Sequence, residues 1–316
     1  MWYALATYET GAGTAPALVL GDTLYDLAQC WRDVEGAAPP AWAASVGQVI
    51  ATGCATTLAQ LASAASTRAA AGQLQALPVD ARHLPAPYTP PRIFGTASNY
   101  IEHAAEMNTL LAAKSESSPY IFMKASTSVI GTGATVLLPP ETEKPDWEVE
   151  LGVVIGRGGR RIRKEDALAH IAGYTVVNDV SARDMNRRSD YPFKHDWFRG
   201  KSWDTFCPMG PWFVPAACVA DPHNLSLHLS LNGEPMQDGN TSELIWNIFE
   251  QIEYLSSILT LQSGDLIMTG TPAGVGMGRG LFLKAGDVME ARVGSVGTIR
   301  NPVAAEAIEH NTRDCA

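Results

Sequence analysis

The stretch of residues 146–155 reads Asp146-Trp147-Glu148-Val149-Glu150-Leu151-Gly152-Val153-Val154-Ile155 and combines acidic residues with a run of apolar ones. Its alternating start and its apolar end predict a β-strand. Side chains alternate between the two faces of a strand, so the carboxylates of Glu148 and Glu150 lie side by side on one face. Val149 and Leu151 take the opposite, apolar face.

Two neighbouring carboxylates repel each other where solvent is scarce. Either one of them takes up a proton or a cation lies between them, and a divalent metal is the simplest solution. The alternative is a solvated edge strand whose acidic residues only discourage aggregation. The pair Glu148 and Glu150 is therefore a candidate metal site, and the strand alone leaves both interpretations open.

Composition places the chain among globular proteins. Its 316 residues, 46% of them hydrophobic, can form a large core in one big domain or two unequal ones. The net charge of −10 opposes binding to nucleic acid or anionic lipid, and no stripe of lysine and arginine compensates for it. No apolar run is long enough to cross a bilayer and no signal-peptide pattern opens the chain, so we expect a cytoplasmic protein.

The cysteines show neither a Cys-x-x-Cys pair nor the dense spacing of a disulfide scaffold. We expect reduced thiols at all five positions. Cys207 lies close to a candidate site, but no histidine or asparagine motif marks it as a nucleophile, so core packing is its expected role. The cysteines are Cys30, Cys54, Cys207, Cys218 and Cys315.

The N-terminal part differs from the rest and predicts a small α+β module. Its two strands and its Ala-rich helical stretch are expected at residues 3–8, 17–20 and about 46–77. Prolines clustered between Pro78 and Pro91 exclude a helix or a central strand and indicate an extended linker. We therefore predict two units, residues 1–88 and residues 89–316.

Beyond the linker, strand patterns alternate with Gly/Pro turns, which predicts a β-dominated α+β fold. The strands are expected at residues 134–138, 148–155, 173–179, 225–231, 265–269 and 288–293. Two helices should interrupt them, one over residues 164–171 and a longer amphipathic one that Thr241 would cap.

A set of ordered runs in this larger unit resembles one known family. The runs are Asn99–Glu106, Met123–Thr127, Glu148–Gly156, Gly173–Tyr174, Asn178–Asp184, Gly200–Ser202 and Thr269–Gly276. Together they make about residues 91 to 303 resemble the fumarylacetoacetate hydrolase family. The resemblance implies the mixed β-sandwich roll of that family with peripheral helices, preceded here by the small N-terminal module, and it implies a homodimer.

The resemblance also implies that Glu148, Glu150 and Asp179 together bind a divalent cation. Three carboxylates with no Cys or His at ligand spacing form a hard oxygen site, for which Mg²⁺ or Mn²⁺ is the expected ion. Taken alone, Asp179 could instead be a turn or cap residue.

His103 and Glu106 are three residues apart, so one helical turn places both on the same side, where the carboxylate can orient the imidazole. The alternative is an inert surface pair on an exposed helix. In the family the equivalent residues activate water near the metal, so the resemblance implies a general-base dyad. It likewise implies that Lys201 is an active-site cation, where otherwise a solvated loop lysine would be expected.

The Gly-rich loop that starts at Gly270 lacks the Lys-Ser/Thr ending of a phosphate-binding loop. We expect the Thr271 hydroxyl and the Gly270 backbone N–H to contact a substrate carboxylate instead. Arg183 is a further candidate for substrate contact, with an internal ion pair as the equal alternative. Specificity for the acyl group is expected in residues 109–118 and 186–198.

The candidate metal ligands, the dyad and Lys201 together predict a divalent-metal-dependent hydrolase. Its substrate would be a 2,4-dioxo acid such as an acylpyruvate or fumarylpyruvate, and aromatic-acid catabolism is the expected setting. His103, oriented by Glu106, would take a proton from water, and the hydroxide would attack the C4 carbonyl. Lys201 would stabilise the developing charge, and the products would be pyruvate and a carboxylic acid. An oxaloacetate-type decarboxylase, a 2-hydroxydienoate isomerase and a non-catalytic metal-binding protein remain alternatives.

Overall fold

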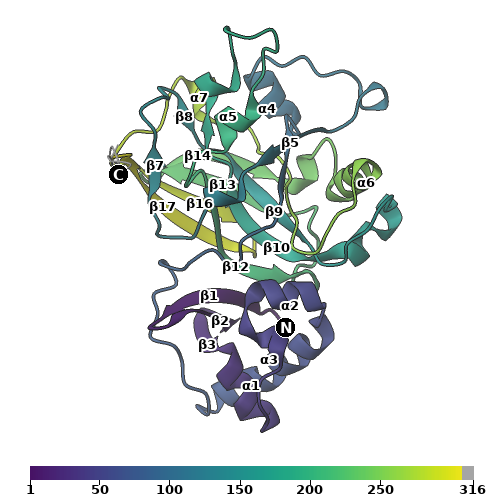
Figure 1. The fold of residues 1–316 in the computed structure, drawn as a ribbon, viewed down its shortest axis with the longest axis vertical. Coiled ribbons are helices and arrows are strands. Elements are labelled where there is room, and N and C mark those ends of the chain that lie inside the picture. Colours follow the sequence, from purple (N-terminus) through teal and green to yellow (C-terminus); the bar gives the residue numbers. More distant parts are fainter. Residues whose placement is uncertain (308–316) are drawn as a thin grey trace, which may run out of the picture.

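A long mixed sheet runs through the molecule, and a computed structural model describes its residues 1–307 (Figure 1). In order across this sheet, the strands are β3 (Thr23–Asp26), β2 (Gly13–Leu20), β1 (Ala4–Thr10), β12 (Cys207–Pro215), β10 (Ile171–Asn178), β9 (Val149–Ile155), β15 (Leu266–Met268), β4 (Ile93–Ala97) and β5 (Tyr120–Lys124). The short β6 (Val129–Ile130) pairs with β12 beside this path. The strand predicted from the opening motif, β9, thus lies inside the sheet, and all seven of its residues are buried.

A second sheet packs against the first. In order, its strands are β14 (Glu234–Asn240), β13 (Ser226–Leu231), β16 (Val288–Val293), β17 (Gly297–Ala305) and β7 (Val136–Leu138). Alternate residues of β13 and β16 are buried, and both strands contact β9. A small separate pairing joins β8 (Pro145–Asp146) to β11 (Ser181–Ala182). This strand-dominated core with peripheral helices confirms the predicted fold class.

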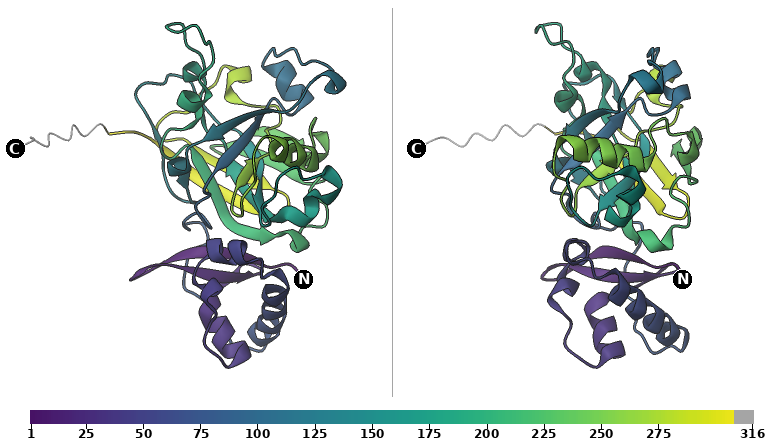
Figure 2. Two further views of the ribbon diagram at one scale, coloured as in Figure 1. Left: turned by 45° about the vertical axis from the view of Figure 1, so that its right-hand side comes forward. Right: turned by 90° about the vertical axis from the view of Figure 1, so that its right-hand side faces the viewer.

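The N-terminal module forms one end of the molecule, drawn in purple in Figures 1 and 2. Besides β1 to β3 it contains the helices α1 (Leu27–Glu35), α2 (Val46–Thr52) and α3 (Ala55–Ala70). Strand β1 pairs with β12 at Leu5 and Phe213, and side chains of both parts share one hydrophobic cluster. The single helical stretch expected here is two helices, because Gly53 ends α2 with a left-handed backbone, φ 65°. The boundary near residue 88 stays a prediction.

The helices of the larger part are α4 (Ile101–Glu106), α5 (Trp197–Lys201), α6 (Ile248–Ile258) and α7 (Gly276–Arg279). The prediction that Thr241 caps the amphipathic helix was wrong, because that helix, α6, begins at Ile248 with Asn247 as its cap. The Thr241 hydroxyl instead accepts a hydrogen bond from the backbone N–H of Leu225, and residues 241–243 form only a 3₁₀ turn. The helix expected over residues 164–171 is a 3₁₀ helix, Lys164–His170.

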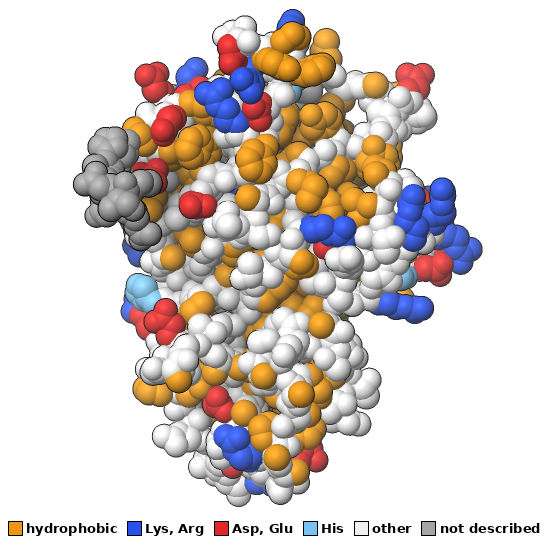
Figure 3. Space-filling view, in the orientation of Figure 1, with side chains coloured by type: hydrophobic (Ala, Val, Ile, Leu, Met, Phe, Trp, Pro, Cys, Tyr) orange, Lys and Arg blue, Asp and Glu red, His pale blue; other side chains and the backbone are white. Residues whose placement is uncertain are grey.

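Acidic and basic side chains are interspersed on the face shown in Figure 3. Within residues 1–307, no helix has both the length and the apolar character needed to cross a membrane. Four cysteines of the described part are free thiols, as predicted, namely Cys30, Cys54, Cys207 and Cys218. The fifth, Cys315, lies outside the described residues.

Candidate functional site

Three buried carboxylates meet where β9 and β10 pair. Glu150 lies on β9, Glu148 directly precedes that strand, and Asp179 directly follows β10. The antiparallel register places Glu150 opposite Val177, and the backbone N–H of Asp179 donates a 2.8 Å hydrogen bond to the carbonyl of Glu148. One oxygen of each carboxylate lies within 4.8 Å of the others, and the three residues are 5%, 2% and 0% exposed. The strand pairing itself therefore assembles the acidic triad.

Buried cations surround two of these carboxylates. The Nζ atom of Lys201 lies 2.5 Å from Glu148 Oε2 and 2.7 Å from Asp179 Oδ2. The Nζ atom of Lys124 lies 2.5 Å from Asp179 Oδ1. The Nη2 atom of Arg183 lies 2.6 Å from Glu148 Oε1. Glu148 and Asp179 are thereby held in fixed orientations.

Glu150 is the exception, since no ion pair among the described residues includes it. Its Oε2 accepts a 2.5 Å hydrogen bond from the backbone N–H of Gly270. Burial, together with the charges of Asp179 and Glu148, raises the pKa of Glu150 well above its usual value. Burial would also raise the pKa of Glu148, but Arg183 and Lys201 lower it below its usual value. Glu150 is therefore the carboxyl group of the triad whose ionised form has no cationic partner among the described residues.

The donor set fits a hard divalent cation. It consists of carboxylate oxygens only, it is buried, and its members repel one another unless a positive charge lies between them. Mg²⁺ and Mn²⁺ prefer such oxygen ligands, whereas Zn²⁺ sites usually contain histidine or cysteine. Glu148, Glu150 and Asp179 are the residues that would hold the ion.

The predicted dyad lies on α4, beside the triad. The Nδ1 atom of His103 is 3.5 Å from Glu106 Oε2, an ion-pair distance longer than a normal hydrogen bond. His103 is 5% exposed. Both oxygens of Glu106 also accept from the backbone N–H of Gly274 at 3.1 Å. Burial alone would raise the pKa of Glu106, but the interactions with its neighbours His103 and Gly274 outweigh this effect. The net result is a pKa below the usual value, so this carboxylate is ionised beside the imidazole.

The groups expected to contact substrate are engaged within the protein. Gly270 donates its N–H to Glu150, and the Thr271 hydroxyl donates to the carbonyl of Val149 at 2.9 Å while accepting from Gln237. Arg183 pairs with Asp146 as well as with Glu148, with Nε 2.8 Å from Asp146 Oδ2. Gly270 and Arg183 thus orient carboxylates, Thr271 bonds the backbone of β9, and contact of these three residues with substrate stays a prediction.

Two features of the site escaped the sequence interpretation. Lys124 was part of a family-like run but received no role, although it is buried and bonded to Asp179, 55 residues away. Its position at the end of β5, in a strand with no other charge, was the available signal. Lys201 was expected in a turn and instead ends α5, where the rings of Phe122 and Trp197 lie beside its ammonium group at 5.2 and 5.9 Å.

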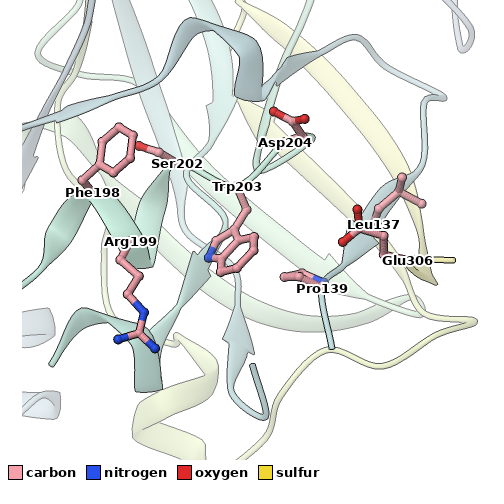
Figure 4. A pocket seen from close by; sticks show the side chains of 8 residues that line it. All are labelled: Leu137, Pro139, Phe198, Arg199, Ser202, Trp203, Asp204 and Glu306. Carbon is pink, nitrogen blue, oxygen red and sulfur yellow. The ribbon is translucent and has the colours of Figure 1, made fainter. Parts of the chain in front are cut away.

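The opposite side of α5 faces a separate cavity of about 490 Å³ (Figure 4). Phe198 and Arg199 of α5 line it, together with Ser202, Trp203, Asp204, Leu137, Pro139 and Glu306. None of the triad or dyad residues belongs to its wall. The short helix α5 thus contributes Lys201 to the carboxylate site and Phe198 and Arg199 to the wall of this separate cavity.

Comparisons with known proteins agree with this geometry. The chain is 42% identical over 239 residues to the human protein named oxaloacetate tautomerase FAHD2A, mitochondrial, covering 75% of this chain and 74% of that one. It is 44% identical over 215 residues to 2,4-didehydro-3-deoxy-L-rhamnonate hydrolase of Sphingomonas sp. (strain SKA58), covering 67% and 73%.

A solved structure matches almost the whole chain. It is the maleylpyruvate hydrolase of Sphingobium sp. SYK-6 in complex with manganese(II) ion and pyruvate, with a TM-score of 0.72, 27% identity and coverage of 97% of this chain and 100% of that one. The sequence model described as fumarylacetoacetate (FAA) hydrolase C-terminal matches residues 92–304. The chain therefore belongs to the fumarylacetoacetate hydrolase family.

Proposed function

We propose that this protein is a divalent-metal-dependent hydrolase that cleaves a carbon–carbon bond of a 2,4-dioxo acid to give pyruvate and a carboxylic acid. The observation that supports it most is the buried pair of His103 and Glu106 beside the acidic triad. A base next to a metal site is suited to activating water. Two of the similar proteins are named hydrolases, and one of these was crystallised with manganese and pyruvate.

The triad supplies the place for the metal. A bound Mg²⁺ or Mn²⁺ acts as a Lewis acid that polarises a substrate oxygen and favours negative charge on it. Glu148 and Asp179 are already oriented by Lys201, Lys124 and Arg183, so only Glu150 must change its protonation on binding.

The dyad moves the proton. Glu106 faces Nδ1 of His103, which keeps the proton on that nitrogen and leaves Nε2 free to accept one from water. The resulting hydroxide forms a bond to the C4 carbonyl carbon, and the C3–C4 bond breaks with its electron pair moving to C3. His103 then returns the proton to C3, which yields pyruvate and the acid. Atoms and charge balance without a further reactant.

Lys201 provides a permanent positive charge. Burial would lower its pKa, but Asp179 and Glu148 raise it above the usual value, so the ammonium group stays protonated. Fixed positive charge in a dry site stabilises the negative charge that develops on the substrate during bond breaking. The same group holds two of the metal-binding carboxylates in place.

A second candidate is the tautomerisation of oxaloacetate, which the similarity to the human relative favours. Here His103 would move a proton between carbon and oxygen of the substrate without breaking the carbon chain. The decarboxylase and isomerase alternatives differ from hydrolysis in which bond of the substrate breaks.

Substrate choice separates these reactions. Metal-stripped protein is supplied with Mn²⁺ or Mg²⁺ and assayed with acetylpyruvate, fumarylpyruvate and oxaloacetate in parallel. Pyruvate and free acid in equal amounts from an acylpyruvate support the hydrolase. Rapid keto–enol exchange of oxaloacetate without cleavage of any acylpyruvate contradicts it and supports the tautomerase.

Location and assembly are separate expectations. We propose a cytoplasmic homodimer, although the similar human protein is named mitochondrial. Fractionation of cells and the molar mass in solution test the two points.

A further inference from the structure

The hydroxyl group of Tyr100 is buried without a hydrogen-bond partner among residues 1–307. Tyr100 directly precedes α4, the helix that carries the dyad, and is only 2% exposed. A buried hydroxyl that makes no hydrogen bond destabilises a protein, because it has given up its bonds to water without a replacement. Such a group needs an explanation, and for Tyr100, which adjoins the helix of the dyad, a bound ligand could supply the missing acceptor.

The backbone at Tyr100 is fixed against the loop that orients Glu150. Its neighbour Asn99 donates a 2.8 Å hydrogen bond to the carbonyl of Thr269. The next residue, Gly270, packs so closely that a Cβ there would lie 2.7 Å from Cβ of Asn99. The same Gly270 donates its N–H to Glu150. Tyr100 therefore adjoins both the helix that carries the dyad and the residue that holds the loop next to Glu150.

The phenol remains a proton donor at this place. Burial and the negative charges of Glu150 and Glu243 raise the pKa of Tyr100 above its usual value. A neutral hydroxyl near carboxylates has a proton to offer to an incoming oxygen. The position favours an anionic ligand with a carboxylate or carbonyl oxygen.

The other donors around the triad are already used. Lys201, Lys124 and Arg183 bond the carboxylates of Glu148 and Asp179. The N–H of Gly270 and the hydroxyl of Thr271 bond protein oxygens as well. Nδ1 of His103 and Nη2 of Arg183 also make no hydrogen bond, but each faces a carboxylate, at 3.5 and 2.6 Å, whereas the buried Tyr100 hydroxyl has no partner of either kind among the described residues.

We propose that the Tyr100 hydroxyl donates a hydrogen bond to a carboxylate or carbonyl oxygen of the bound oxo acid, and is thus a substrate-binding residue of the site. This inference rests on the proposed function, because it takes the substrate class from it. The expected effect on stability does not depend on the proposed function, because the unpaired hydroxyl destabilises the protein even when no substrate is bound.

The test compares Tyr100→Phe with Tyr174→Phe. The Tyr174 hydroxyl is also buried and without a partner in the described part of the chain, but it lies on β10, and its charged neighbour is Asp221. Four quantities are measured on each full-length variant: the melting temperature without metal, the Kd for Mn²⁺, the Kd for pyruvate with Mn²⁺ present, and kcat/KM for acetylpyruvate.

For Tyr100→Phe we expect pyruvate binding weakened about tenfold and kcat/KM lowered by about 10- to 1000-fold, as for loss of one donor to a charged oxygen. Its melting temperature should equal or exceed that of the unchanged protein, and its Mn²⁺ affinity should stay within about twofold, because no protein hydrogen bond is lost. Tyr174→Phe should retain all ligand and kinetic constants.

Unchanged pyruvate binding in Tyr100→Phe overturns the inference, and so does a lowered melting temperature or weakened Mn²⁺ binding, which would show a structural role. If the unchanged protein binds pyruvate but cleaves no acylpyruvate, the proposed hydrolase is wrong while weakened binding in Tyr100→Phe still supports the inference. A protein that binds no pyruvate at all contradicts both.

Discussion

Lys124 and Asp179 form a fully buried ion pair, with Nζ 2.5 Å from Oδ1 and both side chains 0% exposed. The two residues come from different strands of one sheet, since Lys124 ends β5 and Asp179 follows β10. The same ammonium group donates to the carbonyl of Val180 at 3.0 Å. This contact connects β5, at the edge of the sheet, to the acidic triad.

Replacement of Lys124 should therefore destabilise the whole fold. Lys124→Met leaves buried negative charge with one cation fewer, and we expect the free energy of unfolding to fall by about 3 kcal/mol. Urea denaturation checks the value. Lys114→Met is the matched control, because Lys114 pairs with Glu250 at 2.8 Å but is 45% exposed. An equal, small effect in both variants would contradict a special role for Lys124.

Glu150→Gln should affect metal binding and stability in opposite directions. Burial, Asp179 and Glu148 all disfavour the ionised form of Glu150, so an uncharged amide at this position should leave the melting temperature of the metal-free protein the same or higher. Affinity for Mn²⁺ should fall by at least about tenfold, because one anionic ligand is lost. Calorimetric titration and thermal unfolding measure both. A variant that melts lower and still binds Mn²⁺ normally contradicts the assignment.

The stability of the protein should decline in mild acid because of His223. Burial lowers the pKa of His223 below its usual value, and its Nε2 accepts a hydrogen bond from the backbone N–H of Ile248 at the start of α6. Below about pH 6.5 the unfolded chain takes up a proton that the folded histidine resists, so the free energy of unfolding falls as the pH is lowered. In His223→Gln this decline between pH 7 and pH 5 should be smaller. An identical pH profile in both proteins would exclude His223 as the cause.

Cys207 should be unreactive in the folded protein. Burial raises its pKa to about 12, and the thiolate that would react is absent at neutral pH. Iodoacetamide followed by peptide mass spectrometry should label Cys207 only after denaturation, while the less buried Cys54 is labelled earlier. Rapid labelling of Cys207 in native protein would contradict its role in core packing.

The sequence predicts those parts of the site that depend on local spacing. Glu148 and Glu150 share a strand face and His103 and Glu106 share a helical turn, and both arrangements follow from the period of the element alone. The start of α6 was missed because a contact with Leu225 employs the hydroxyl of Thr241. Asp179 was assigned only through the family, because β9 and β10 bring it beside Glu148 through strand pairing.

Contacts between residues far apart in the sequence could not be predicted either, because they also depend on which strands pair. The pairing of β1 with β12 joins residues about two hundred positions apart, and no local pattern of β1 specifies its partner. The bond between Lys124 and Asp179 likewise depends on the strand order of the sheet. Such relationships appear only after the chain has folded.

In the proposed hydrolase, His103 activates water beside a divalent metal. The most direct measurement is pyruvate release from acetylpyruvate by Mn²⁺-loaded protein and by His103→Ala, with the Mn²⁺ affinity of each determined in parallel. We expect kcat to fall by about 10²- to 10⁴-fold in the variant while Mn²⁺ affinity is retained. A His103→Ala variant that binds Mn²⁺ and releases pyruvate at the rate of the unchanged protein would contradict this role of His103.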